Sequence, residues 1–338
     1  MTTISHKHAL TRALPAPHGP LSAAVITAVT RSAGAELSSP PEVDRADPYG
    51  DDLALALYTC YELHYRGFTD VDPAWEWDPR LLELRAAMER VFLTALRRDT
   101  GSGDDVATAL DALLVEHVPG DGVSHYLRDH AQWWHMREYF AHRSVYHLKE
   151  ADPHAWVIPR LHGRAKASLV AVEFDEFGGG RGERMHSQLF ADLMTEAGLC
   201  PDYLHYLDDV PAPAIAIVNM MSMFGLHRRL RGALVGHFAA AEISTAPSAQ
   251  RIAQALERLG AGPACMLFFT EHIEADAVHE QVLRRDVIGD LLDREPELAG
   301  DVVFGIAGTE LLEARLADHL LSAWRADTTS LRRPLASR

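Results

Sequence analysis

Residues 51–68 read DDLALALYTCYELHYRGF and residues 78–98 read DPRLLELRAAMERVFLTALRR, and in both stretches apolar residues recur every three or four positions. This spacing places the apolar side chains on one face of a helix, and Pro79 suits the first turn of the second helix. Similar patterns cover residues 104–118, 137–150, 153–177, 183–197, 213–245, 248–259, 262–295 and 301–326. Alternating runs typical of strands are almost absent, so the sequence predicts an all-α fold.

The predicted helices divide the chain into four regions. Residues 1–48 contain scattered Pro, Ser, Gly and Thr, which predicts a mobile leader with one short helix near residues 21–31. Residues 49–130 predict an N-terminal helical region, residues 131–326 the main helical bundle and residues 327–338 a C-terminal tail.

The charge and cysteine content argue against several classes of protein. Asp and Glu number 48 against 32 Lys and Arg, giving a formal net charge of −16, which disfavours nucleic acid and anionic membranes as partners. Cys60, Cys200 and Cys265 are far apart and form no CxxC pair, so we expect neither disulfides nor a thiolate zinc site. This cysteine usage, with no membrane-length apolar run and no signal peptide pattern, predicts a cytoplasmic protein.

The chain has 19 histidines, and the clearest cluster is EHIEADAVHEQ at residues 271–281. His272, Asp276 and His279 are four and three residues apart, so they lie on one face of a helix, where they can hold a divalent ion. A carboxylate three residues before a histidine is also the pattern of dinuclear iron sites in helical bundles. The alternative is a solvated acidic helix face with incidental histidines.

Further candidate ligands lie upstream. The segment DEFGGGRGERMH, residues 175–186, offers Glu176, Glu183 and His186, and helical spacing alone favours Glu183 as the partner of His186. Its glycines follow no strand, so they do not indicate a phosphate-binding loop. Glu242 follows the apolar run of ALVGHFAAAEIS, where a carboxylate is costly unless it binds a metal or an arginine of HRRLRG. Glu150, in YHLKEADPH, taken alone is a helix-end residue.

Together these residues supply three imidazoles and four carboxylates. Two Fe²⁺ ions would carry a charge that the four carboxylates balance. Oxygen and imidazole ligands without thiolate suit iron or manganese better than structural zinc.

The order of these residues resembles that of the haem-oxygenase-like diiron oxidases, also called iron-containing redox enzymes. After Glu150 the pattern continues with Glu176, His186, Glu242, His272, Asp276 and His279. The separations between successive residues of this series are 26, 10, 56, 30, 4 and 3. Within the family this spacing is closest to the diiron domain of the N-oxygenase of the streptozotocin pathway. The resemblance covers about residues 131–326, and it favours Glu176 over Glu183 as the ligand that accompanies His186.

The resemblance implies a haem-oxygenase-like helical bundle with an additional N-terminal helical region that supports a homodimer. It implies two iron ions, O₂ as co-substrate and a peroxo-diferric intermediate, with a cofactor that is easily lost on purification. The metal ligands would be Glu150, Glu176, His186, Glu242, His272, Asp276 and His279. We expect no catalytic residue beyond these ligands. Glu183, Tyr146, His154, Arg160 and His227 are candidates for the pocket or for support of the ligands.

The activity expected from the resemblance is oxidation of a small biosynthetic substrate, with N-oxygenation of an amine, amidine or guanidine nitrogen as the preferred reaction. The chain shows no flavin or haem motif, so a ferredoxin or a reductase would supply electrons. The same cofactor could instead serve oxidative C–C cleavage or decarboxylation of a fatty or amino acid. The remaining alternatives are a ferritin-like iron-binding protein that uses Glu183, a zinc hydrolase, a haem protein and a metal-free helical scaffold.

Overall fold

The computed structural model describes residues 11–35, 42–115 and 120–336, and the side chains of residues 274–278 lie outside this description. The described residues are predominantly helical, and their β-pairing is an isolated bridge between Arg12 and Phe68. The all-α prediction is therefore confirmed. No helix in the described part of the chain has the length and apolar character needed to span a membrane.

The α-helices are α1 Pro20–Val29, α2 Asp51–Glu62, α3 Pro79–Thr100, α4 Val106–Ala112, α5 Val123–His130, α6 Trp133–His147, α7 Asp152–Ala155, α8 Gly163–Glu176, α9 His186–Glu196, α10 Ala212–Leu226, α11 Arg231–Arg258, α12 Pro263–Gln281, α13 Asp290–Arg294 and α14 Ala299–Arg325. A π-helix, Val282–Gly289, joins α12 to α13. Short 3-10 turns are Val43–Arg45, Pro73–Trp77, Ile158–Arg160, Gly178–Gly180, Gly182–Arg184, Arg228–Leu230 and Pro296–Leu298.

Helix α3 shows how the local sequence sets a boundary. The Asp78 side chain accepts hydrogen bonds from the backbone N–H groups of Arg80 and Leu81, and Pro79 follows it. An aspartate cap followed by proline satisfies the free N–H groups of a first turn, so the helix begins where the sequence predicts.

The helix predicted over residues 213–245 is instead two helices, α10 and α11. The backbone of His227 is extended, and the turn Arg228–Leu230 follows it before α11 begins. Helix α11 then continues past Pro247 to Arg258, so the predicted break near residue 247 is absent.

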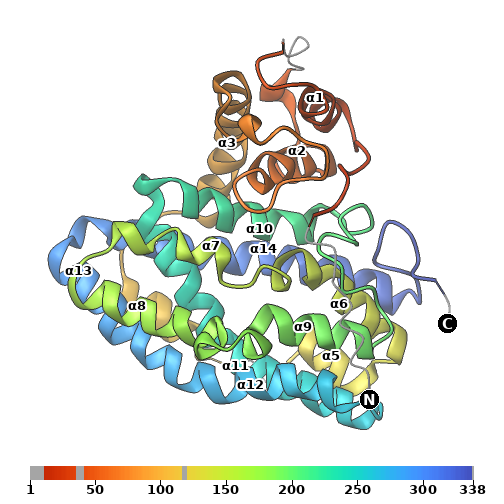
Figure 1. Ribbon diagram of the computed structural model, residues 1–338. Coiled ribbons are helices and arrows are strands. Elements are labelled where there is room, and N and C mark those ends of the chain that lie inside the picture. The colour runs from red at the N-terminus through yellow and green to blue at the C-terminus, as the bar shows by residue number, and fades with distance from the viewer. Residues whose placement is uncertain (1–10, 36–41, 116–119, 337–338) are drawn as a thin grey trace.

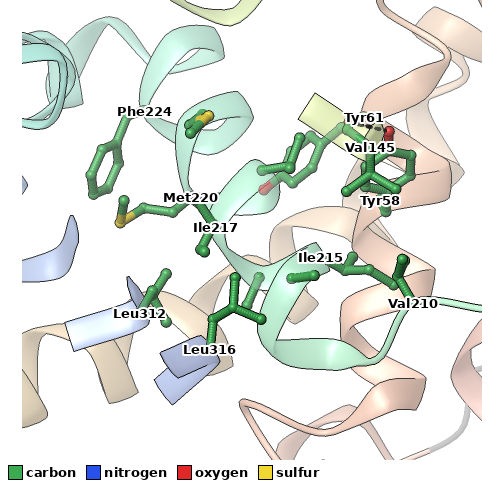
Figure 2. Close-up of a cluster of buried hydrophobic side chains, with 14 of the residues drawn as sticks. Tyr58, Tyr61, Val145, Val210, Ile215, Ile217, Met220, Phe224, Leu312 and Leu316 are labelled. Atoms are coloured by element: carbon green, nitrogen blue, oxygen red, sulfur yellow. Dashed lines mark hydrogen bonds between the residues drawn. The ribbon is translucent and has the colours of Figure 1, made fainter. Parts of the chain in front are cut away.

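Helix α10 carries no charged residue and is buried on nearly all sides. It lies between the N-terminal helices and α14 (Figure 1). Met220 lies on the side of Leu312 of α14, and Phe224 contacts Phe304 of the same helix, whereas Ile215 and Val210 lie on the side of Tyr58 of α2 (Figure 2). Because α10 has no charged residue, all of its faces can be buried. It can therefore pack against α2 on one side and α14 on the other.

The described segments nearest the two ends of the chain are also packed against other elements. Arg12 forms an ion pair with Asp208, and Asp52 accepts hydrogen bonds from the backbone N–H groups of Leu21 and Ser22 at the start of α1. In the tail, Ser330 donates its backbone N–H to Glu138. The segment 11–35, which composition predicts to be mobile, is thus packed and contains α1, while the division into four regions stays a prediction.

Candidate metal centre

Five segments of the chain bring carboxylates and imidazoles to one buried region. Glu150 lies just after α6, Glu176 ends α8, His186 begins α9, Glu242 lies within α11, and α12 supplies His272 and His279. All of these side chains are buried. Because the helices cross the bundle separately, residues far apart in the sequence, such as Glu150 and His272, become neighbours.

The glycines at 178–180 shape the turn between α8 and α9. Each has a positive φ, and a Cβ on Gly178 would lie 2.6 Å from the backbone N of Met185. Glycine therefore permits a close chain reversal that a larger residue would block. As a result, Oε2 of Glu176 lies 2.8 Å from Nδ1 of His186.

Among the side chains that the structure describes, the potential ligand atoms fall into two groups. One group is Glu150, His186 and His272, and the other is Glu176, Glu242 and His279. Within each group the ligand atoms lie within 4.8 Å of one another. Glu176 connects the groups, since its Oε1 lies 3.8 Å from Nδ1 of His279 while its Oε2 faces His186. The Glu176 carboxylate is therefore placed to contribute a ligand atom to either group.

Several buried polar atoms fit a bound cation. Oε2 of Glu150, Oε1 of Glu176 and Nδ1 of His186 are buried without a hydrogen-bond partner among the described residues. Nδ1 of His186 and Oε2 of Glu176 approach closely yet do not form a hydrogen bond of acceptable geometry. Buried polar atoms are normally satisfied, so the convergence of carboxylate and imidazole atoms that lack partners favours a bound metal ion.

His272 has the orientation of a metal-binding imidazole. Its Nδ1 lies 2.7 Å from the carbonyl oxygen of Phe268, which can only accept, so we assign the ring proton to Nδ1. The Nε2 lone pair then faces Glu150, whose Oε1 is 3.7 Å away. Metal-binding histidines commonly donate their second ring nitrogen to a carbonyl in this way.

Two groups at the site hold protons more strongly than they would in water. Burial raises the pKa of Glu242, and the nearby carboxylate of Glu176 adds to this effect. Burial opposes a charged imidazolium at His279, but the carboxylates of Glu242 and Glu176 outweigh it and raise the pKa of His279 to about 9. Iron binding would therefore have to displace protons.

Sequence reasoning missed three residues at the site. Glu173 is buried one turn before Glu176, both its carboxylate oxygens lack a described partner, and burial followed by Glu176 and Glu242 raises its pKa. His147 places Nδ1 2.7 Å from Oε1 of Glu150, and Asp175 places Oδ2 3.3 Å from Nε2 of His279. Helical spacing from Glu176 would have indicated Glu173. For His147 and Asp175 the sequence offers no signal except that they lie close to Glu150 and Glu176 along the chain.

The remaining predicted residues lie in different places. Tyr146 lines the cavity beside the ligands, and His154 is buried against Phe238 with ring centroids 4.2 Å apart. Arg160 donates to the carbonyl groups of Gly225 and Leu226, and Nε2 of His227 lies 2.8 Å from Glu89. Glu183 is exposed on the turn Gly182–Arg184, away from both groups. The side chain of Asp276 lies outside the described residues.

A cavity of about 290 Å³ adjoins the ligands. Its wall includes Glu150, Glu176, Glu242 and His272, and on another side the ion pair between Arg143 and Glu313. That pair is bidentate, with both N–O distances 2.7 Å. Apolar residues such as Phe268 and Ile252 complete the wall. The cavity can therefore hold a small substrate that has both polar and apolar parts.

A helical bundle whose facing helices direct carboxylates and imidazoles inward has the architecture of non-haem metal-dependent proteins. The chain belongs to the iron-containing redox enzyme family, whose sequence model matches residues 137–314. It is therefore an oxidoreductase, as the sequence predicts.

A search of curated proteins finds a distant relative, a nitrosourea synthase from Streptomyces achromogenes subsp. streptozoticus. The two sequences are 26% identical over 160 residues, which is 47% of this chain and 34% of the relative. The matching part thus spans about a third of the relative's length.

Proposed function

We propose that this chain is a non-haem diiron oxygenase that oxidises a nitrogen atom of a small substrate. The observation that carries the proposal is the pair of buried ligand groups joined by Glu176. Glu150, His186 and His272 would hold one iron, and Glu176, Glu242 and His279 the other, with Asp276 added from α12. When bound, the two ions would supply the redox chemistry with O₂.

The protein's own residues would set the geometry of this chemistry. His147 orients the Glu150 carboxylate, and the Phe268 carbonyl fixes the ring of His272 so that Nε2 faces inward. The apolar wall of the cavity limits water, which protects a reactive site from side reactions.

The reaction would replace a substrate N–H by N–OH. O₂ accepts four electrons, two from the substrate and two from an external ferredoxin or reductase, and the second oxygen atom leaves as water with two protons. The distant nitrosourea synthase supports nitrogen as the atom oxidised. The polar ion pair of Arg143 and Glu313 in the cavity wall favours a polar substrate over the long fatty chain of the C–C cleavage alternative.

The proposal is tested by loading the apoprotein with Fe(II) under anaerobic conditions. We expect about two irons per chain, and, after exposure to ¹⁸O₂ with a chemical reductant and a panel of amines and guanidines, one labelled oxygen in an N-hydroxylated product. Mössbauer spectra should show coupled diferric iron after oxidation. Binding of iron without reduction of O₂, or equal turnover with zinc and no reductant, would overturn the proposal.

Two glutamates on either side of the glycine turn provide a matched pair of variants. Glu176→Gln should lower iron content to about half or less, because Glu176 contacts both ligand groups. Glu183→Gln should leave iron content unchanged, because Glu183 is exposed and outside both groups. Metal analysis after gel filtration measures both. The opposite pattern would support the ferritin-like alternative, which relies on Glu183.

A further inference from the structure

Glu62, at the C-terminal end of α2, forms an ion pair with the segment that contains Glu150. Glu62 and Lys149 are almost completely buried, at 0% and 1% exposure, and Nζ of Lys149 lies 2.9 Å from Oε2 of Glu62. The hydroxyl of Tyr203 donates to the Glu62 carboxylate, at 2.9 and 2.8 Å from its two oxygens. Lys149 directly precedes Glu150, so this buried network fixes the backbone next to a proposed iron ligand.

Arg66, one turn beyond Glu62, contacts the same segment on both sides of Glu150. It donates to the carbonyl oxygen of Leu148 at 3.1 Å and forms an ion pair with Asp152 at 4.0 Å. The hydroxyl of Tyr58 on α2 also donates to the carbonyl oxygen of Val145, at 3.0 Å. Residues 145–152 are thus attached at several points to the N-terminal helices.

The backbone between Glu150 and α7 adopts a conformation that its sequence does not favour. Ala151 is buried and has φ 72° and ψ −29°, the left-handed region, which is unfavourable for a residue with a Cβ. Such conformations persist where surrounding contacts enforce them. Glu62 and Arg66 contact residues on both sides of Ala151, namely Lys149, Leu148 and Asp152.

A buried ion pair is weak evidence for a stabilising role, because desolvation offsets most of the attraction between the charges. A role in fixing the backbone position is the better explanation for the pair of Glu62 and Lys149, because it joins α2 to the residue that precedes Glu150. Helices α1 to α3 lie outside residues 137–314, which match the family. They form a layer over α10 at the top of the bundle (Figure 1).

We propose that Glu62 and Lys149 are positioning residues for the ligand group of Glu150, His186 and His272. The N-terminal helices would then complete one half of the iron centre, in addition to any role in dimerisation. This inference rests on the proposed function, because it assumes that Glu150 binds iron.

The test is the double variant Glu62→Gln/Lys149→Met, which removes both charges together and leaves no buried charge unpaired. We expect it to fold and to bind about one iron per chain where the wild type binds about two. Mössbauer spectra should show isolated rather than coupled iron. Circular dichroism and thermal unfolding verify the fold. A folded double variant that binds two coupled irons with unchanged affinity would overturn the inference.

A second variant covers the case in which the double variant does not fold. Tyr203→Phe keeps both charges and removes the hydroxyl that donates to Glu62. We expect affinity for Fe(II) to fall about tenfold at one site and to stay unchanged at the other. Affinities that match those of the wild type at both sites would also contradict the inference.

The matched control is Glu89→Gln. Glu89 is likewise a buried carboxylate of the N-terminal helices, bonded to Tyr61 and His227, but it does not contact residues 145–152. The Glu89→Gln variant should keep both irons. If it lost as much iron as the double variant, the loss would reflect general destabilisation of the fold and would contradict the inference. Failure of the wild type to bind two irons would instead overturn the proposed function, and this is measured first.

Discussion

At the scale of single residues, the buried histidines outside the metal centre are neutral bases. His142 is 1% exposed, and burial, followed by His319 and Arg143, lowers its pKa to about 3. Its Nε2 lies 2.9 Å from the hydroxyl of Ser330, in the tail that packs on α6. Unfolding releases this imidazole into water, where its pKa returns to about 6.5.

This difference predicts a specific acid sensitivity. Below about pH 6.5 the unfolded chain binds a proton at residue 142 that the folded chain does not, so stability falls as pH decreases toward 3. Between about pH 7.5 and about pH 5 this single group should lower the free energy of unfolding by about 2 kcal/mol. The His142→Gln variant keeps a side-chain amide near Ser330. Its free energy of unfolding should fall by about 2 kcal/mol less than that of the wild type over this pH range. Urea unfolding of the metal-free proteins at both pH values measures the difference, and parallel pH profiles would contradict it.

The residues that converge at the centre could largely be predicted, but their partners could not. The resemblance, and not helical spacing, pointed to Glu176 rather than Glu183, and the structure brings Glu176 to His186. Helical periodicity favoured Glu183 because it assumes a continuous helix, whereas the backbone of Met185 is not helical and α9 begins only at His186. The contact of Lys149 with Glu62 depends on how two distant helices pack, which no local pattern encodes.

At the scale of elements, glycines allow the backbones of α11 and α14 to approach each other closely. A Cβ on Gly305 would overlap the carbonyl group of Ala233, and one on Gly236 would overlap that of Val302. The helices therefore pack backbone against backbone, and α11 in turn carries Glu242. The sequence predicted both helical regions but not this approach, since a glycine within a helical pattern ordinarily signals only reduced helix propensity.

Gly305→Ala should destabilise the protein although alanine is the better helix former. The intrinsic gain is about 1 kcal/mol, but the added methyl group must separate two helices, so we expect a net loss of about 1–3 kcal/mol in the free energy of unfolding. Gly300→Ala in the same helix is the control, because its Cβ would meet only Gly103 O at 3.6 Å. Chemical denaturation compares the two. Equal stability of both variants would show that the helices adjust without cost.

At the scale of the whole molecule, the acidic character of the chain extends into its core. Glu150, Glu173, Glu176 and Glu242 are all buried, in a protein whose formal net charge is −16. Burying carboxylates is unfavourable unless protons or cations compensate them. Burial raises the pKa of Glu173 and Glu242, and neighbouring carboxylates raise that of His279 to about 9, so each group holds a proton more strongly than it would in water. Divalent cations would replace those protons and link the centre to global stability.

Iron should therefore stabilise the fold. A ligand that binds only the folded state at about 100 times its dissociation constant adds about 2.7 kcal/mol per site, which raises the Tm by several degrees. We expect anaerobic Fe(II) to produce this rise in the wild type and a chelator to reverse it. Glu176→Gln should show a much smaller rise, because its carboxylate connects both ligand groups. Differential scanning calorimetry measures both proteins. An equal rise in the variant would mean that iron stabilises the chain from a site elsewhere.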